Sequence, residues 1–378
     1  MKRIYLDYNA STPMDPKVIK EIASGMTVMG NPSSIHEEGR QARFLIEKAR
    51  EKVAQLLGVK SKEIIFTSGG SESDSLALMG VVYGNKKKKN HIVLSAIEHH
   101  AVLETASYLE KNGCKISFVP CSKQGIVDVE KLASYLTDQT ILVSIQSANN
   151  ETGVCQPIEE IANLCKQKEI FFHSDIVQSI GKVPIDIKGL SLASLSAHKF
   201  YGPKGVGILF IKEGVPFERL IYGGNQEKGK RGGTENLLGI IGLAKALEIS
   251  LLEMEEQKER QFRLIERLWE SLADLPGIER VGDPNRRVPN TLLVLFSGLS
   301  GHDLLIGLDL AGIAASSGSA CMSGSSQPSH VLMAMGYGSS QAISSVRFSI
   351  GKFTTEEEIT EAAQRIREVV LSQQKALS

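Results

Sequence analysis

The sequence has no excess charge of either sign, no long hydrophobic run and no dense set of cysteines. Its 43 basic residues balance 43 acidic ones, whereas nucleic-acid-binding and disordered chains usually carry a large net charge. No segment approaches about 18 consecutive apolar residues, so no membrane span is expected. The amino terminus reaches Asp7 and Asn9 without the apolar core of a signal peptide. We therefore expect neither a membrane protein nor a direct partner of nucleic acid.

The cysteines number five, and an odd count scattered along a long chain does not form a disulfide framework. A reducing, cytoplasmic setting is therefore expected. Cys321 lies in a stretch of small residues with few side chains to anchor it, which predicts a mobile, reactive thiol. The other cysteines lie beside strands, turns or helices and are interpreted as structural: Cys114, Cys121, Cys155 and Cys165.

The chain is rich in glycine, which favours tight turns and close approaches of the backbone to a ligand. Between about residues 60 and 215, short apolar runs alternate with segments of helical period. This alternation predicts an α/β fold with a mostly parallel, seven-stranded sheet flanked by helices. Polar, glycine-rich segments follow the strands, where open α/β sheets bind ligands. Helices are expected to begin near Ser71, His99, Asp128 and Pro157, and strands to cover Glu63–Phe66, His91–Ser95, Lys115–Val119, Thr140–Ile145, Ile170–Ser174, Leu192–Ser196 and Val206–Ile211.

The second half of the chain predicts a smaller α+β domain. The helical stretch from Thr234 to Ala273 is too long for one ordinary helix, and we expect it to bridge two domains. An amphipathic helix around Phe44–Val53 is expected to pack against the smaller unit. The predicted domains are 15–255 for the large one, and 1–14 with 256–378 for the small one. Within the small domain we expect strands near Asn290–Phe296 and Ser345–Ile350, and helices near His302–Leu310 and from Thr355 onward.

Three segments carry residues suited to one kind of chemistry. Lys199 follows an apolar strand, and a buried neutral lysine forms a Schiff base with an aldehyde cofactor such as pyridoxal phosphate. Asp175 ends another strand, where a buried carboxylate needs a cation such as a protonated pyridine nitrogen. The tract Thr67–Ser73 joins a strand, a glycine turn and a helix start, which suits a phosphate. Each has a simpler alternative: a solvated lysine, a helix N-cap, and a capping box that uses Ser71 and Asp74.

A series of motifs lies in order along almost the whole chain: Tyr5–Ala10, Gly30–His36, Gly69–Ser73, Glu98–Val102, Asn149–Gly153, Asp175 with Gln178, Ser196–Lys199, Arg231–Asn236, Ser316–Cys321 and Val346–Ser349. Together they resemble the cysteine desulfurases, in the class V aminotransferase branch of the fold-type I pyridoxal-phosphate enzymes. Most of these motifs are weak singly, but the ordered set is specific.

The resemblance implies pyridoxal phosphate as the cofactor and a role for each matched residue. Lys199 would be the Schiff-base lysine and the base that moves a proton from the substrate Cα. His99 would lie on the ring and carry protons, and Arg347 would bind the substrate carboxylate. Asn31 would lie at the substrate mouth or shape a loop. The remaining contacts implied are Asp175 with the ring nitrogen, Asn150 and Gln178 with the ring hydroxyl, Gly70, Ser71, Ser196 and His198 with the phosphate, and Thr234 reaching the phosphate from the other subunit of a homodimer.

Cys321 determines the reaction that the resemblance implies. As a thiolate it would attack the sulfur of L-cysteine, leaving L-alanine as product and a persulfide on itself. The segment from Cys321 to Pro328 resembles the extended loop with which part of the family carries sulfur to a partner. The implied protein is a homodimeric cytoplasmic desulfurase without a metal. It would serve an acceptor protein in iron–sulfur cluster assembly or tRNA thiolation.

Two other kinds of function share part of this pattern. A selenocysteine lyase or another class V pyridoxal-phosphate enzyme would keep the cofactor residues, but it would not need a mobile Cys321. A non-catalytic adaptor would not need to retain the reactive residues together. The desulfurase is therefore the preferred prediction, because the chain keeps Lys199, Asp175, His99, Arg347 and Cys321.

Overall fold

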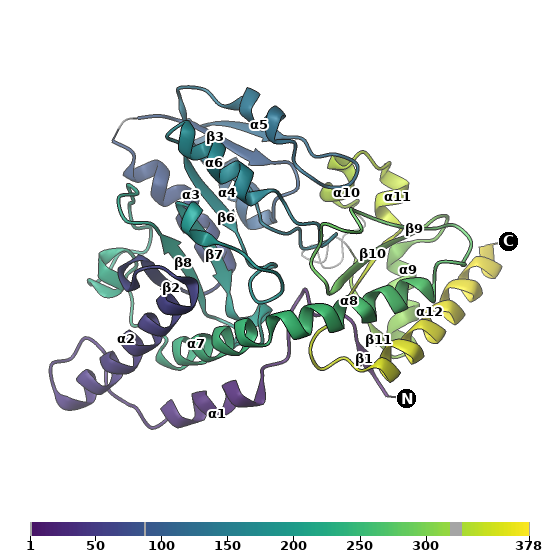
Figure 1. Cartoon of the computed structure of the whole chain (residues 1–378), viewed down its shortest axis with the longest axis horizontal. Helices are drawn as coiled ribbons and strands as arrows, with labels where there is room; N and C mark the ends of the chain where they lie inside the picture. Colours follow the sequence, from purple (N-terminus) through teal and green to yellow (C-terminus); the bar gives the residue numbers. More distant parts are fainter. Residues whose placement is uncertain (1, 87, 318–326, 378) are drawn as a thin grey trace.

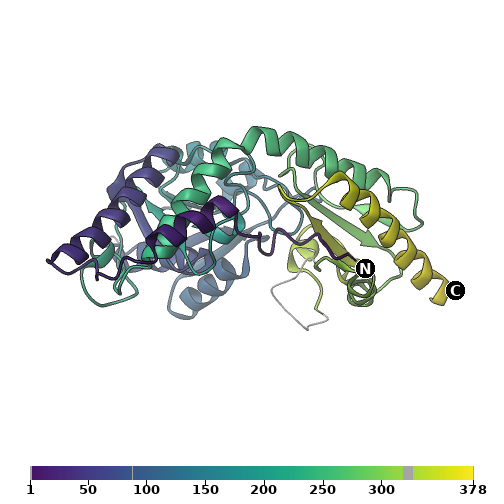
Figure 2. The ribbon, with the colours of Figure 1, turned by 90° about the horizontal axis from the view of Figure 1, so that it is seen from below.

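The computed structural model describes residues 2–86, 88–317 and 327–377, which form two lobes (Figure 1). Two consecutive helices, α7 (Leu237–Leu252) and α8 (Met254–Glu270), run from the large lobe to the small one (Figure 2). Leu243 and Leu247 of α7 belong to the core of the large lobe. Leu264 and Leu268 of α8 belong to the core of the small lobe. The expected bridging stretch is thus confirmed, as two helices that meet at Glu253.

The large lobe is built on a seven-stranded sheet with the strand order β2-β8-β7-β6-β5-β3-β4 in the described part of the chain. β8 runs antiparallel to both neighbours, and the other neighbouring pairs are parallel. The expected α/β fold class is confirmed, and the strands lie within one residue of the expected ranges. They are β2 (Ile64–Thr67), β3 (His91–Ser95), β4 (Lys115–Val119), β5 (Thr140–Ser144), β6 (Phe171–Asp175), β7 (Leu192–Ser196) and β8 (Gly207–Ile211).

Helices cover both faces of this sheet, which explains why its central strands are apolar throughout. Helices α3 (Gly70–Gly84) and α4 (His100–Lys111) pack on one face. Helices α5 (Val129–Tyr135) and α6 (Ile158–Gln167) pack with α7 on the other. Short 3-10 helices complete the lobe: η1 (Ser61–Glu63), η2 (Ile187–Gly189), η3 (Ala197–Lys199) and η4 (Gln226–Gly229).

The two N-terminal helices, α1 (Pro16–Gly25) and α2 (Glu37–Leu57), join the large lobe. The expectation that the helix around Phe44–Val53 packs against the smaller unit is wrong. Ile46 and Val53 are buried in the same core as α7, and Phe44 on another side of α2 is 65% exposed. An apolar stripe shows that a helix packs, but it does not identify the partner.

The small lobe has a three-stranded antiparallel sheet in which β10 (Thr291–Phe296) lies between β12 (Ser345–Ser349) and β9 (Ile278–Arg280). Alternate residues of β10 face two cores, one under α8, α9 (Gly301–Leu310) and α12 (Glu356–Leu377), the other under α10 (His330–Ala334) and α11 (Ser339–Ile343). β1 (Ile4–Tyr5) pairs in parallel with β11 (Ile313–Ala314). The small α+β unit agrees with expectation, while the domain boundaries 15–255, and 1–14 with 256–378, stay a prediction.

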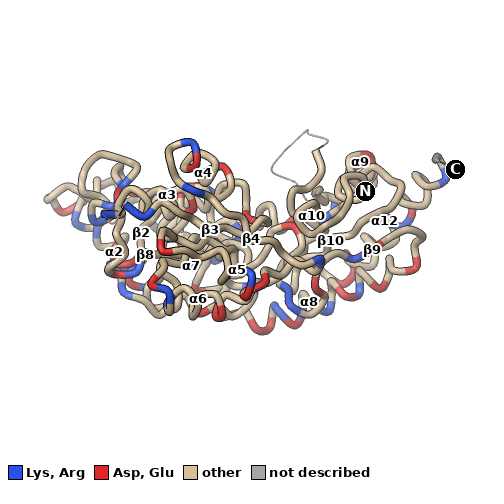
Figure 3. Tube along the Cα trace, turned by 90° about the horizontal axis from the view of Figure 1, so that it is seen from above, with Lys and Arg blue, Asp and Glu red and all other residues tan. Residues whose placement is uncertain are grey.

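Charged residues of both signs are interspersed over both lobes, most visibly along α8 (Figure 3). This mixture agrees with the zero net charge. Within the described ranges, no helix is both long and apolar enough to cross a membrane.

Candidate active site

A cavity of about 220 Å³ lies at the carboxyl ends of β6 and β7 and is lined by residues of both lobes. This is the edge at which open α/β sheets bind ligands. The cavity brings together ten of the residues expected at the site: Gly70, Ser71, His99, Asn150, Asp175, Gln178, Ser196, His198, Lys199 and Arg347.

Lys199 lies in η3, directly after β7, and lines the cavity. Its Nζ donates hydrogen bonds to the main-chain oxygens of Asn9, at 2.6 Å, and Ala10, at 2.9 Å. The turn that follows needs glycine at position 202, because a Cβ there would lie 2.9 Å from Ala197 O. Because these two hydrogen bonds hold Nζ at the cavity, Lys199 is not the solvated surface lysine of the alternative interpretation.

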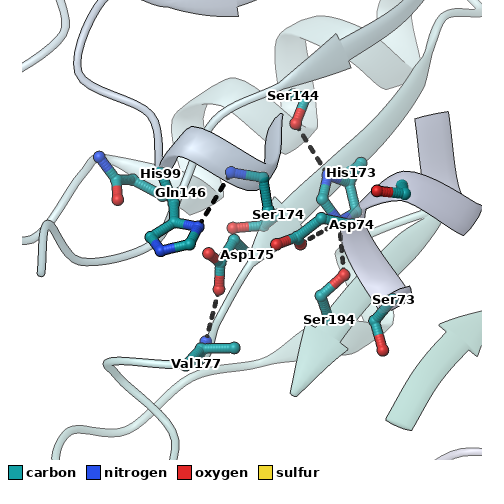
Figure 4. A network of polar contacts seen from close by, with 12 residues as sticks. Ser73, Asp74, His99, Ser144, Gln146, His173, Ser174, Asp175, Val177 and Ser194 are labelled. Atoms are coloured by element: carbon teal, nitrogen blue, oxygen red, sulfur yellow. Dashed lines mark hydrogen bonds and ion pairs between the residues drawn. The ribbon is translucent and has the colours of Figure 1, made fainter. Parts of the chain in front are cut away.

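Asp175 is the last residue of β6 and is 7% exposed. Its Oδ1 accepts a hydrogen bond from the N–H of Val177 at 2.8 Å (Figure 4). Burial raises the pKa of Asp175 to about 6, although the Val177 N–H and the positive charge of Lys199 both favour the ionised form. No helix begins after it, so the N-cap alternative does not apply. A buried carboxylate at a cavity wall suits a cationic group such as a protonated ring nitrogen.

His99 precedes α4 and caps it, because its Nδ1 accepts a hydrogen bond from the N–H of Ala101 at 3.1 Å. Burial lowers the pKa of His99 to about 4, and the nearby Lys199, His100 and His330 act in the same direction. The imidazole is therefore neutral at pH 7. Since Nδ1 is an acceptor, the ring proton is on Nε2. A neutral imidazole with one donor nitrogen suits a ring-stacking, proton-carrying role.

The first turn of α3 forms another wall of the cavity through Gly70 and Ser71. Gly69, the residue before the helix, provides no capping side chain. Asp74 is 1% exposed and lines the cavity, so the capping-box alternative with Ser71 and Asp74 is not realised. The N–H groups at the start of a helix attract anions. With the Ser196 hydroxyl beside them, they offer a place for a phosphate.

Close packing between backbone segments supports the turn at Gly69, before α3. A Cβ at Gly207 of β8 would lie 2.7 Å from Gly69 Cα and 2.6 Å from Leu195 O. His198, on the neighbouring wall, has its Nδ1 3.3 Å from Ser11 Oγ. Burial lowers the pKa of His198 to about 4, and Lys199 and Lys204 lower it further.

Arg347, on β12, brings the small lobe into the site, and its side chain is only 2% exposed. Its guanidinium donates to Asn150 O at 2.8 Å and to Asp7 Oδ1 at 2.9 Å. Its Nε has no hydrogen-bond partner within the described ranges. A buried guanidinium with an unsatisfied donor suits a carboxylate ligand.

Gln178 lines the cavity and is held at both ends of its amide. Its Nε2 donates to Asn9 O at 3.1 Å, and its Oε1 accepts from Lys182 Nζ at 2.8 Å. Burial lowers the pKa of Lys182 to about 7, and the charges of Lys199 and Arg347 lower it further.

Asn9 is a site residue that the sequence interpretation did not single out, and it connects the two lobes. It is 1% exposed. Its Nδ2 donates to Thr291 Oγ1 at 2.8 Å, its Oδ1 accepts from Asn290 Nδ2 at 3.0 Å, and its N–H donates to Ser349 Oγ at 2.9 Å. The only signal in the sequence was its place in the motif Tyr5–Ala10. The other lining residues not expected there are Ala10, Asp74, Gln146 and Val177.

Two expected site residues of the described chain do not line this cavity. Asn31 is exposed, and its Oδ1 accepts from the N–H of Ser33 at 2.9 Å, so it shapes its own loop. Thr234 is exposed in the segment before α7. Cys321 lies outside the described residues.

The donor set around the cavity fits pyridoxal phosphate. Lys199 offers an amine, the buried Asp175 offers an anion for a ring nitrogen, and the α3 turn offers donors for a phosphate. Among the residues that the structure describes, no group of three His, Cys, Asp or Glu side chains is arranged to hold a metal ion. Fold and cavity thus define the class of lysine-dependent pyridoxal-phosphate enzymes.

Comparison with known proteins agrees with this class. The family model described as aminotransferase class-V matches residues 4–361. The cysteine desulfurase IscS of Clostridium botulinum is 48% identical over 364 residues, which cover 95% of this chain and 92% of that protein. A solved structure described as a NifS-like protein is 41% identical, with a TM-score of 0.92 and coverage of 98% of this chain and 99% of its own. Another, described as SspA in complex with cysteine, is 32% identical, with a TM-score of 0.82 and coverage of 93% and 100%.

The chain therefore belongs to the class V aminotransferases and, within them, to the cysteine desulfurases, which are pyridoxal-phosphate enzymes. The expectations of family and cofactor are confirmed. The roles of the individual site residues stay predictions.

Proposed function

We propose that this chain converts L-cysteine to L-alanine and holds the released sulfur as a persulfide on Cys321. The observation that carries the proposal is the cavity in which Lys199, Asp175 and Arg347 meet from two lobes. The relative with bound cysteine and the relatives named as desulfurases support the choice of substrate.

Each residue has a task that its surroundings allow. Pyridoxal phosphate, when bound, supplies an aldehyde for amines and a ring that withdraws electrons from the substrate Cα. Lys199 holds the cofactor at rest, and its neutral amine, once released, takes the proton from the substrate Cα. Arg347 binds the substrate carboxylate with a planar fork of donors. The ionised Asp175 stabilises positive charge at the ring nitrogen. His99 donates a hydrogen bond from Nε2 to the substrate amine or thiol.

Sulfur transfer is assigned to Cys321. Its thiolate forms an S–S bond with the substrate sulfur while the C–S bond of the substrate breaks. The electron pair of that bond stays on the substrate Cβ, which takes up a proton, and L-alanine leaves. The step needs no external oxidant, because sulfur is transferred while the substrate carbon is reduced. The persulfide sulfur then passes to an acceptor protein, in iron–sulfur cluster assembly or in tRNA thiolation.

The proposal includes a homodimer in the cytoplasm. Thr234 is exposed in this chain and outside its own cavity, as expected of a residue that reaches the phosphate of the partner subunit. A reducing compartment agrees with the free thiols of Cys114, Cys121, Cys155 and Cys165.

The decisive test is the mass of the intact protein after brief exposure to L-cysteine without reductant, with peptide mapping of any added sulfur. We expect one sulfur on Cys321 and L-alanine in solution. Lys199→Ala should abolish both products. Cys321→Ala should keep the change in cofactor absorbance that follows L-cysteine addition, but it should transfer no sulfur. Cys114→Ala is the matched control and should behave as wild type, since its partly buried thiol lies outside the cavity.

Two results would contradict the proposal. Sulfur transfer at the original rate by Cys321→Ala would remove the role given to that thiol. A yellow, cofactor-loaded protein that gains no sulfur from L-cysteine would point to a selenocysteine lyase or another class V reaction.

A further inference from the structure

Asp74 is a buried acid at the cavity to which the proposed reaction gives no task. It projects from the first turns of α3, is 1% exposed and lines the cavity. Its Oδ1 has no hydrogen-bond partner in the described part of the chain. Figure 4 shows it beside His173 and Asp175, which lie two residues apart on β6. A buried carboxylate that has no cationic partner is costly in its ionised form.

His173 does not supply the missing positive charge. Its Nε2 lies 3.7 Å from Asp74 Oδ1, but both ring nitrogens already have hydroxyl partners. Nδ1 is 2.8 Å from Ser144 Oγ, and Nε2 is 2.9 Å from Ser194 Oγ. Complete burial lowers the pKa of His173 to about 3, so the imidazole is neutral at pH 7.

The groups that act on Asp74 distinguish it from Asp175. Burial is the largest cause that raises the pKa of Asp74 well above its usual range, and the charge of Asp175 acts in the same direction. Only the hydroxyl of Ser194 favours its ionised form. Asp175, in contrast, has the N–H of Val177 and the charge of Lys199 in favour of ionisation. Two adjacent buried carboxylates do not both ionise, and the better solvated one keeps the charge.

We propose that Asp74 is protonated in the working enzyme and is a positioning residue, whose neutrality leaves Asp175 as the ionised carboxylate facing the cofactor ring nitrogen. The proposal rests on the role given to Asp175 above. An ionised Asp74 would repel the charge of Asp175 and drive a proton onto it. The ring nitrogen would then lose its anionic partner. The protonated acid also offers an O–H donor on the side where Oδ1 lacks a partner.

The protonation state is tested on the cofactor-loaded protein by infrared spectroscopy at neutral pH. The wild-type minus Asp74→Asn difference spectrum should contain the carbonyl stretch of a protonated carboxylic acid. Glu98→Gln is the matched control. Burial raises the pKa of Glu98 to about 8, so this variant should remove a different band. If Asp74→Asn does not fold, Ser194→Ala should instead shift the Asp74 band, because the hydrogen bond between the Ser194 hydroxyl and Asp74 is lost. Absence of such a band, or a band that neither change affects, overturns the proposal.

A second readout uses the affinity for pyridoxal phosphate and the pH dependence of the bound cofactor's absorbance. Asparagine is neutral and similar in shape, so Asp74→Asn should keep the affinity within about threefold and leave the pH profile unchanged. Asp175→Asn should weaken binding by about tenfold or more and shift the profile. A tenfold loss in Asp74→Asn would mean that Asp74 acts through a negative charge, contrary to the proposal. Neither readout depends on cysteine turnover, so a failed desulfurase assignment would leave the result interpretable.

Discussion

At the scale of single residues, the site is made of titratable groups whose charges are set by burial. The imidazoles of His99, His173 and His198 are neutral, since burial lowers their pKa values to about 4, 3 and 4. Burial acts on the acids in the opposite sense and raises the pKa of Glu98 to about 8.

The buried imidazoles predict a loss of stability in acid. The unfolded chain protonates His173 below about pH 6.5, but the folded chain does not until about pH 3. The free energy of unfolding should thus fall with decreasing pH through this window, by up to about 1.4 kcal/mol per pH unit for this residue. His173→Gln should be less stable than wild type at pH 7, because Ser144 and Ser194 lose a partner, yet show a shallower slope between pH 6.5 and 4. Urea unfolding at several pH values measures both.

His302→Gln is the matched control for this experiment, because the His302 side chain is exposed. It should keep the slope of wild type. Equal slopes in all three proteins would show that His173 does not titrate as its burial requires.

Residue identities at the site were partly predictable. Lys199 and Asp175 were found because a charged residue directly after an apolar strand is conspicuous. Asn9 and Gln146 carry no such signal, since a polar residue in a loop is ordinary. Their importance comes from contacts with distant segments, such as the Asn9 bond to Thr291.

At the scale of elements, the cavity depends on glycines where strands and turns approach closely. Gly207 of β8 lies against the turn before α3, with no room for a Cβ beside Gly69 Cα and Leu195 O. Both neighbouring atoms belong to the backbone, so they cannot move aside as a flexible side chain would. The position of the α3 turn, and with it the proposed phosphate site, depends on this contact.

Gly207→Ala should therefore push the Gly69 turn away from β8. We expect a loss of about 1 to 3 kcal/mol in the free energy of unfolding, as for other overpacked cores, and weaker binding of pyridoxal phosphate. Gly189→Ala is the matched control, since its Cβ would meet Ala162 Cβ at an ordinary 3.4 Å. Urea unfolding and cofactor titration measure the two effects. A folded Gly207→Ala protein with wild-type cofactor affinity would contradict the role given to this contact.

Elements of the large sheet were predictable because buried parallel strands are continuous apolar runs bounded by polar turns. The shorter elements β1, β9, β11, α10 and α11 span only two to five residues and lack a periodic signal. The packing partner of α2 was predicted wrongly, since α7 became its neighbour only through the fold of the intervening chain.

At the scale of the whole molecule, two lobes close on one cavity, and the proposed active unit is a pair of chains. Between the lobes, Lys352 of the small lobe pairs with Asp15 and with Glu253 Oε2, the latter at 3.2 Å. This buried contact lies where α7 meets α8 and supports their arrangement. Contacts between residues more than 300 positions apart are set by the complete fold, which is why the site across the lobes was not derivable from local patterns.

The proposed homodimer predicts complementation between two defective chains. Thr234→Glu should repel the phosphate in the partner's site, and Lys199→Ala should inactivate its own site. A hybrid dimer of the two combines the intact Lys199 of one chain with the intact Thr234 of the other, so one of its two sites should work. Mixing the variants under conditions of subunit exchange should restore L-alanine production. Each variant alone, exchanged with itself, is the control, and an inactive mixture that contains hybrid dimers would contradict the assignment of Thr234.

The bonds of the N-terminal segment have a consequence for biosynthesis. Residues 4–10 leave the ribosome long before their partners in the fold: β1 pairs with β11, and Tyr8 and Asn9 donate their N–H groups to Ser349. These partners are made later, since synthesis proceeds from the amino terminus. The segment that holds Lys199 through Asn9 O therefore cannot make all its contacts until Ser349 has been translated. A product that ends before Ser349 lacks these contacts, so we expect it not to hold Lys199 in the proposed site.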